Sequence, residues 1–161
     1  MAGTALTQSM IDTLVSKLQF YKYQVSFGDT ILGPLNSPPK VEADIETKET
    51  VLYETGVDPL AEIISKNNAK ITLEVNDVDA AMGLLKGFKK GDNLLDSTKA
   101  KALTFVPLTS DENAKALTFE NAYLQPGLAT NFAEGDDPNY ITLNFIAKPD
   151  ADDGELYTWE A

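Results

Sequence analysis

The chain has 161 residues, of which 43% are hydrophobic and 24% are charged, and this composition is typical of one soluble globular domain with its own core. It contains no Cys and no His, which excludes disulfides, thiolate metal sites and the commonest general base. The formal net charge is −12 and every basic residue is Lys, so we expect no tight grip on a phosphate backbone.

The N-terminal residues 1–19 fit either a short helix or an extended arm. Met10, Leu14 and Leu18 lie on one helical stripe, whereas the many Ser and Thr residues disfavour a helix. The next element is predicted to be a strand, because large apolar and polar residues alternate through residues 20–27. A Pro-rich connection that cannot be regular structure follows it.

Two further strands are predicted on either side of a long connection. Apolar and polar residues alternate over residues 41–47 and again over residues 69–75. Val51 and Tyr53 fit a continuation of the first of these strands, which residues 55–59 would then end. The connection, residues 48–66, is too apolar for a solvent-facing loop, and residues 60–64 have a helical spacing. Its large apolar side chains are Val51, Leu52, Tyr53, Leu60, Ile63 and Ile64. We therefore expect this connection to be covered by its own domain or by a neighbouring copy.

The sequence then predicts a short amphipathic helix over residues 77–88. Its apolar face consists of Val78, Ala81, Met82, Leu85 and Phe88. Asn76 or Asp77 can cap the first turn, the lysines of residues 86–90 suit the last turn, and Gly91 ends the helix. The apolar face is by default a core face, but the apolar connection before it makes a subunit interface more plausible than usual.

The second half of the chain reads as antiparallel strands. Residues 100–105 and 114–119 have the same sequence, Ala-Lys-Ala-Leu-Thr-Phe, which suggests the two strands of a hairpin. The second of them is predicted to continue to Leu124 and to stop at residues 125–127, where Pro and Gly occur. Residues 140–147 form the last clear strand.

The acidic C-terminal tail, residues 150–161, carries the only Trp of the chain, Trp159, and we expect this tail to dock against folded protein. Taken together, the elements predict a mainly β (α+β) fold. We expect a single domain over residues 1–161, built as an antiparallel β-sandwich or open barrel with one flanking α-helix, a long inter-strand loop and terminal arms.

No pattern in the sequence indicates catalysis. The acidic run at residues 150–155 lacks the acid that an EF-hand requires at its twelfth position, which here is Ala161. Glu134, Asp136 and Asp137 could bind a hard cation weakly, but a solvated turn explains them better. No nucleotide-binding or hydrolase motif occurs. We therefore expect no enzyme activity, no cofactor and no metal site.

The order of elements in residues 41–88 resembles the major tail tube proteins of long-tailed bacteriophages. The resemblance rests on an alternating acidic strand (residues 41–46), a long connection containing residues 53–60, a second strand (residues 69–75) and the helix at residues 77–88. The later Thr-rich hairpins fit the same pattern. The N-terminal part of the chain is not covered by the resemblance.

In that family six subunits form a ring whose inner wall is a closed β-barrel, and rings stack into a tube through a long loop and terminal arms. The resemblance thus implies a virion protein of the phage tail, present in the host cytoplasm before assembly. Its partners would be copies of itself and other tail proteins. Residues 48–66 would be the stacking loop, the helix would lie outside the barrel, and the Trp159 tail would reach a neighbour.

The resemblance also implies a lumen through which DNA passes without specific binding. The candidate lumen-facing residues are Glu42, Asp44, Glu46 and Glu74, with Lys48 and Lys70 near the ends of the two strands. A wall lined mostly by carboxylates would repel DNA and let it slide. No apolar run is long enough to span a bilayer and the N-terminus has no signal-peptide pattern, so we expect no membrane insertion.

Other functions remain open at the level of sequence. A capsid decoration protein with a similar β-fold would bind a shell and would form no tubes by itself. An acidic carbohydrate- or calcium-binding domain would gain thermal stability from its ligand. An enzyme that uses only Asp and Glu is the weakest of the alternatives.

Overall fold

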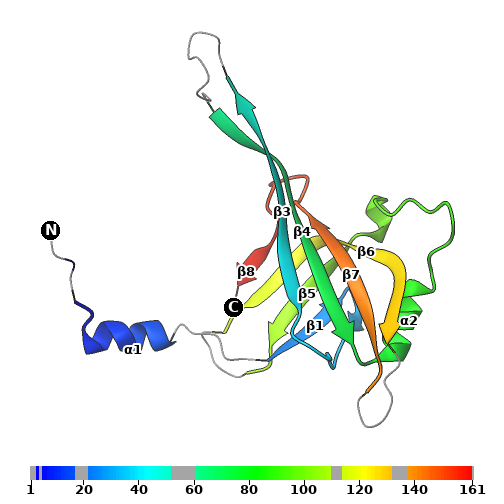
Figure 1. Ribbon diagram of the computed structural model, residues 1–161, viewed down its shortest axis with the longest axis horizontal. Coiled ribbons are helices and arrows are strands. Elements are labelled where there is room, and N and C mark those ends of the chain that lie inside the picture. The colour runs from blue at the N-terminus through cyan, green and yellow to red at the C-terminus, as the bar shows by residue number, and fades with distance from the viewer. Residues whose placement is uncertain are drawn as a thin grey trace.

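The structure, a computed structural model of the whole chain, describes residues 3, 5–16, 22–51, 61–109, 114–131 and 138–160. A body of antiparallel strands carries one helix at its side, and a second helix lies apart from it near the N-terminus (Figure 1). The elements are α1 Gln8–Ser16, β1 Tyr23–Phe27, β2 Thr30–Ile31, β3 Lys40–Thr50, β4 Ala61–Val75, α2 Val78–Leu85, the 3-10 helix η2 Ser97–Lys99, β5 Lys101–Pro107, β6 Ala116–Asn131, β7 Tyr140–Lys148 and β8 Thr158–Glu160. No helix in these ranges is long and apolar enough to cross a membrane.

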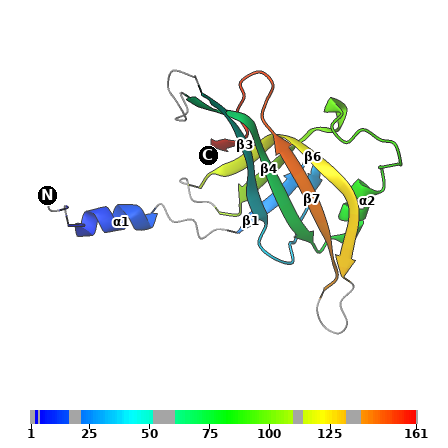
Figure 2. The same ribbon diagram turned by 45° about the horizontal axis from the view of Figure 1, so that its top comes forward.

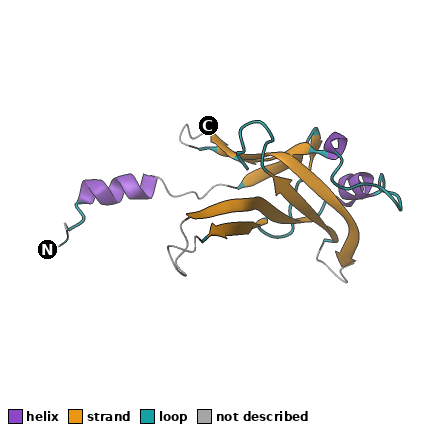
Figure 3. Ribbon diagram, turned by 90° about the horizontal axis from the view of Figure 1, so that it is seen from above, coloured by secondary structure: helices purple, strands orange, loops and turns teal. Residues whose placement is uncertain are grey.

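One sheet contains all the strands of the described ranges, in the order β2-β1-β5-β6-β7-β4-β3, with β8 paired to β6 beside this path. The sheet curls strongly. The rings of Phe27 on β1 and Phe145 on β7 have centroids only 4.9 Å apart, although β5 and β6 separate these strands in the sheet. The curled sheet therefore packs its inner face against itself, which confirms the predicted mainly β architecture of an open barrel (Figure 3).

The short connection from β2 to β3, residues 32–39, pairs with the end of β4. Leu35 forms an isolated bridge with Val75 at the end of β4. The backbone amide of Asn36 donates to the carbonyl of Glu74 at 2.8 Å, and that of Asn76 donates to the carbonyl of Pro34 at 2.9 Å. The Pro-rich segment predicted to be a mere linker thus satisfies backbone groups at the end of β4.

The core lies inside this curled sheet. It is built mainly from inward-facing residues of the strands. These are every second residue, because successive side chains of a strand point to opposite faces of the sheet. Its largest fully buried side chains are Phe119, Phe145, Leu32, Ile71, Leu73, Leu103, Ile141, Leu143, Val25 and Val75. Strands β1, β4, β5, β6 and β7 therefore each contribute one apolar face to a single core.

Helix α2 covers the end of this core, against β6 and β7. It begins where predicted, because the Asp77 side chain accepts a hydrogen bond from the amide of Ala80 at 3.2 Å. It is shorter than the predicted 77–88, because the chain leaves the helix at Lys86 and a glycine, Gly87, follows. Phe88 then packs back onto the core from the turn.

Two strand boundaries predicted from the sequence are wrong. β4 begins at Ala61 and not at residue 69, so residues 61–64 are strand and not helix. β3 runs to Thr50, in keeping with the continuation beyond residue 47 that the sequence left open. β6 does not stop at residues 125–127 but continues to Asn131. The pairing of β6 with β7 shifts register between Gln125 and Ala129. Such an irregularity accommodates Pro126, because proline has no N–H to donate to the neighbouring strand.

Candidate assembly surfaces

The β3–β4 hairpin projects from the body as a two-stranded arm, visible at the top of Figure 1. β4 pairs with β7 only from Ala69 to Val75, so residues 61–68 pair with β3 alone. We call residues 44–51 together with residues 61–68 the arm. An isolated two-stranded ribbon is only marginally stable in water, so the arm lacks the support that the body gives its own strands.

The arm carries large apolar side chains that the described part of its own chain leaves uncovered. Ile63 is 62% exposed and Ile64 is 60% exposed, and Ile45 and Val51 are also exposed. Leu52, Tyr53 and Leu60, the other residues of the predicted stacking loop, lie outside the described residues. Where the structure describes the predicted loop of residues 48–66, residues 48–50 and 61–66 belong to the strand pair.

The outer edge of β3 is open along its length in the described part of the chain. Its face toward the core carries Val41 and Ala43, which pair with the buried Ile71 and Ala69 but are themselves exposed. An 11-residue edge strand with an apolar face is a template for pairing with another chain. The body therefore ends on one side in an unfinished sheet.

The four candidate lumen residues share the other face of β3 and β4. Glu42, Asp44 and Glu46 lie opposite Lys70, Asn68 and Lys66 of β4. The Nζ of Lys66 is 2.9 Å from a carboxylate oxygen of Asp44 and 3.8 Å from one of Glu46.

Two further polar contacts lie at the end of this polar face where β3 begins and β4 ends. The Nζ of Lys40 is 2.7 Å from a Glu42 oxygen, and Glu74 accepts a hydrogen bond from the side chain of Asn36 at 3.3 Å. The expectation of a face lined mostly by carboxylates needs correction, because lysines from β3 and β4 alternate with them. The sequence does not show which charges meet on this face, because that depends on the register between the two strands.

The ion pairs shift the pKa values of these exposed groups so that each group keeps its charged form over a wider range of pH. The hydrogen bond from Lys66 lowers the pKa of Asp44, and the same contact raises the pKa of Lys66. The hydrogen bond between Lys40 and Glu42 likewise lowers the pKa of the carboxyl and raises that of the amine. The polar face thus stays a set of paired charges at neutral pH.

Helix α1 resolves the ambiguity of residues 1–19 in favour of a helix over Gln8–Ser16. None of its residues is buried, and Leu14 and Val15 are more than half exposed. The hydroxyl of Thr7 accepts a hydrogen bond from the amide of Met10 at 3.2 Å, which caps the first turn. The helix presents an apolar stripe to solvent, away from the body (Figure 2).

The acidic tail docks on its own chain, where the resemblance implied a neighbour. β8 pairs with the start of β6, with Trp159 opposite Leu117. The ring of Tyr157 packs edge-on against Phe119 at 6.1 Å, and Leu156 packs against the core. Trp159 itself remains 43% exposed.

The predicted helix face lies mostly in the core of its own subunit. Ala81 and Leu85 are buried, and Val78 and Phe88 are partly buried against the same cluster. Met82 is the exception, at 43% exposed. The structure thus places this face, except at Met82, in the core of its own subunit, because the end of the curled sheet needs this apolar cover. A role of this face in a subunit interface stays a prediction.

The basic loop, residues 86–101, connects α2 to β5 and is not among the surfaces predicted from the sequence. It contains five of the 13 lysines and only two acids, in a chain whose net charge is −12. The lysines of residues 86–90 do not lie in the last turn of the helix, because that turn contains no basic residue. The clustering of Lys in an acidic chain was the available signal.

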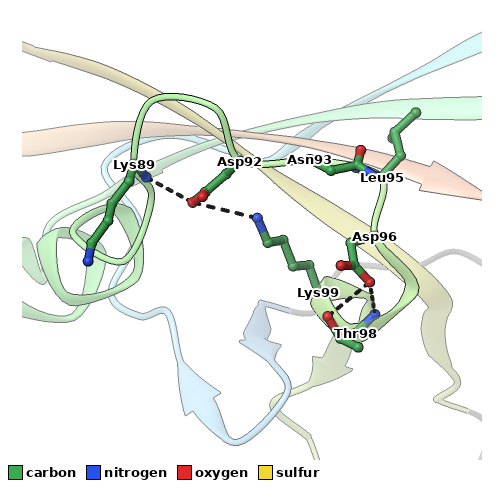
Figure 4. A network of polar contacts seen from close by, with 7 residues as sticks. All are labelled: Lys89, Asp92, Asn93, Leu95, Asp96, Thr98 and Lys99. Atoms are coloured by element: carbon green, nitrogen blue, oxygen red, sulfur yellow. Dashed lines mark hydrogen bonds and ion pairs between the residues drawn. The ribbon is translucent and has the colours of Figure 1, made fainter.

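Short hydrogen bonds hold the basic loop in place (Figure 4). Asp92 accepts from the amide of Lys89 at 2.9 Å and lies 3.7 Å from the Nζ of Lys99. Asp96 accepts from both the amide and the hydroxyl of Thr98, at 3.1 and 3.0 Å. The amide hydrogen bond, with the hydroxyl, lowers the pKa of Asp96. These contacts fix the start of β5.

A pocket of about 250 Å³ lies between the basic loop and the sheet. Apolar side chains from β1, α2 and β6 line it, together with two lysines and Thr98. The Nζ of Lys99 stands 5.3 Å from the centre of the Phe88 ring, and that of Lys101 stands 5.8 Å from the centre of the Phe27 ring. The pocket thus combines an apolar lining with cations held over aromatic faces.

The fold and these surfaces define a class: an open antiparallel barrel with a projecting hairpin and a flanking helix. No protein-family model matches the sequence, and no curated protein matches it significantly. A chain from the PVC sheath–tube complex of an extracellular contractile injection system in the extended state matches with a TM-score of 0.61 and 17% identity. This match covers 98% of this chain and 99% of that one.

Two further solved structures share the fold. A chain from the PVC sheath/tube terminator matches with a TM-score of 0.60 and 16% identity, over 89% of this chain and 96% of that one. A chain from the tube-terminating cap of the anti-feeding prophage matches with a TM-score of 0.59 and 14% identity, over 89% and 91%. The tail-tube-like fold that the resemblance implied is confirmed at the level of fold.

Proposed function

We propose that the chain is a structural subunit of a phage tail tube or of the tube of a phage-like particle. Copies would form rings, six to a ring as the resemblance implies, and the rings would stack. The observation that carries this proposal is the arm beside the open edge of β3. Both are surfaces that one subunit leaves unpaired, and neighbouring copies would cover them.

The comparisons support the proposal by the kind of particle in which the shared fold occurs. The matching chains come from a sheath–tube complex, a sheath/tube terminator and a tube-terminating cap. A subunit of this type would work inside a particle together with other tail proteins. It would act through its contacts and would need neither a catalytic group nor a cofactor.

In this proposal the polar face of β3 and β4 lines the channel. Three of its four carboxylates, Glu42, Asp44 and Glu46, form ion pairs with Lys40 or Lys66, and the chain contains no Arg. Such a wall offers a DNA backbone few unpaired cations, so DNA would release few counterions by binding and would pass without being held. This channel would conduct DNA through contacts that are weak everywhere along its length.

Negative-stain electron microscopy and light scattering of the purified protein at rising concentration test the proposal. We expect rings or tubes of uniform width. Ile63→Asp should leave a folded subunit that no longer forms them, because it places a charge on the exposed apolar surface of the arm.

The matched control is Ile31→Asp, which makes the same substitution at another exposed isoleucine, on the short β2 strand of the body. This variant should assemble like the unmodified protein. A folded monomer at every concentration, without rings, tubes or any rise in mass, would contradict the proposed function.

A further inference from the structure

One face of the arm concentrates negative charge in a way that its own chain does not balance. The register places Glu49 directly opposite Glu62. Like charges directly opposite in an antiparallel pair are destabilising. Among the described residues neither carboxylate forms an ion pair with a lysine; Glu62 only accepts a hydrogen bond from the hydroxyl of Thr47 at 2.8 Å. The arm thus keeps an unfavourable charge pair at an exposed position.

Apolar side chains flank this charge pair on the same face. Ile64 lies opposite Thr47, two positions from the pair along each strand, and residues two apart on a strand share a face. Val51, two positions beyond Glu49, is also exposed. In sequence, residues 49–64 contain four acids and no lysine. The surface needed to cover this face is therefore apolar with a cationic rim.

The pocket beside the basic loop has these properties. Phe27, Leu84, Phe88 and Leu124 supply its apolar lining, and Lys99 and Lys101 supply its cations. Its volume of about 250 Å³ exceeds the roughly 150 Å³ cavity that holds a benzene molecule in an engineered protein, so it has room for an aliphatic side chain. Lys101 forms no ion pair within the described ranges.

The two surfaces cannot meet within one subunit. The arm projects from the body on the side away from α2 and the basic loop, and the views in Figures 1 and 2 agree on this. A contact between them therefore joins two different surfaces of two copies. Such a heterologous contact repeats from copy to copy, closing into a ring or continuing as a filament.

We propose that the acidic face of the arm of one copy docks into the Lys99–Lys101 pocket of a second copy. This inference rests on the proposed function, assembly into a tube, and it names the surface that receives the arm. Glu49 and Glu62 meet the two lysines, and Ile64 enters the apolar part of the pocket. The contact relieves the repulsion between the two glutamates and covers the apolar side chains that a lone subunit exposes.

Charge reversal tests this docking. The double variant Lys99→Glu/Lys101→Glu should raise the protein concentration needed for assembly by about tenfold or more. The reason is that like charges facing each other across an interface weaken binding by at least this factor. Combining it with Glu49→Lys/Glu62→Lys should restore assembly, because the signs are then exchanged. Lys115→Glu, at an exposed lysine outside the basic loop, is the control and should assemble normally.

A cross-linking experiment covers the case in which the reversed variant fails to fold. The chain contains no Cys, so an engineered pair is the only pair that can form. Ile64→Cys and Thr98→Cys are made in separate copies of different tag length, mixed under assembly conditions and oxidised. We expect the mixed-size disulfide dimer, whereas Ile64→Cys mixed with Ile31→Cys should give little of it.

The outcomes separate the two proposals. Assembly of the unmodified protein without the Ile64–Thr98 dimer, or with folded charge-reversed variants that assemble normally, would overturn the docking and leave the tube function intact. Loss of assembly in the reversed variant without rescue by the exchanged charges would also overturn it. Failure of the unmodified protein to assemble at any concentration would overturn both.

Discussion

The two halves of β4 belong to one continuous strand and end in opposite environments. From Ala69 to Val75 the inward residues are buried, because β7 continues the sheet and the curled core lies beneath it. From residue 61 to residue 68 no residue is buried, and Ile63 and Ile64 are exposed. The comparison teaches that pairing with a neighbouring strand makes a strand, whereas a facing layer makes a core. The arm is a strand pair without its facing layer.

This difference between body and arm can be tested on the free energy of unfolding of the isolated subunit. Substitutions in the body should destabilise the subunit, and substitutions of the same kind in the arm should act on assembly alone. The four predictions below go from the largest expected effect on the subunit to the smallest.

Phe145→Ala should have the largest effect. Phe145 is 1% exposed and packs against Phe27, so truncation leaves a cavity in the middle of the curled sheet and should cost about 3–5 kcal/mol. Chemical denaturation measured by circular dichroism gives the value. Ile64→Ala, in the arm, is the comparison and should change the free energy of unfolding by less than about 0.5 kcal/mol. Equal losses would show that the arm is part of the core.

Asp77→Ala should have an intermediate effect, because it removes the side-chain acceptor that caps α2. We expect a loss of about 1 kcal/mol in the same denaturation experiment. Asp77→Asn keeps an acceptor at this position and should recover most of the loss. If Asn were as damaging as Ala, the charge of Asp77 at the start of the helix would matter more than the hydrogen bond.

Acid should weaken the arm only slightly. The pKa of Asp44 is lowered by Lys66, so the carboxylate stabilises the folded arm at pH values above the ordinary pKa of 3.8, and this contribution is lost as the pH falls through the lowered value. A carbon-detected NMR titration should give the Asp44 carboxyl a pKa below 3.8. In Lys66→Gln this pKa should rise toward the ordinary value. An unchanged pKa in that variant would show that the ion pair is absent in solution.

Ile63→Asp should have the smallest effect on the subunit. Because Ile63 is 62% exposed, we expect no change in the free energy of unfolding beyond about 0.5 kcal/mol, despite the loss of rings or tubes. Sedimentation of the folded monomer beside its denaturation curve measures both quantities. A large loss of stability would mean that the arm packs on the body of its own chain.

The sequence by itself determined the local elements. Alternation predicted most of the strands, and the spacing from Val78 to Leu85 with the Asp77 cap predicted α2. These features depend on neighbours within a few positions, so a single sequence contains the necessary information. The mainly β class followed from their number and order, and so did the tail-tube-like fold through the resemblance.

Tertiary structure alone decided how far strands run and which charges and surfaces meet. Pairing with β3 turned residues 61–64 into strand, and pairing with β7 carried β6 past Pro126. Register set lysines of β3 and β4 among the carboxylates of the polar face, and it placed Glu49 opposite Glu62. The pocket beside the basic loop joins residues from β1, α2 and β6. These contacts link positions far apart in the chain, and only the curled sheet brings them together.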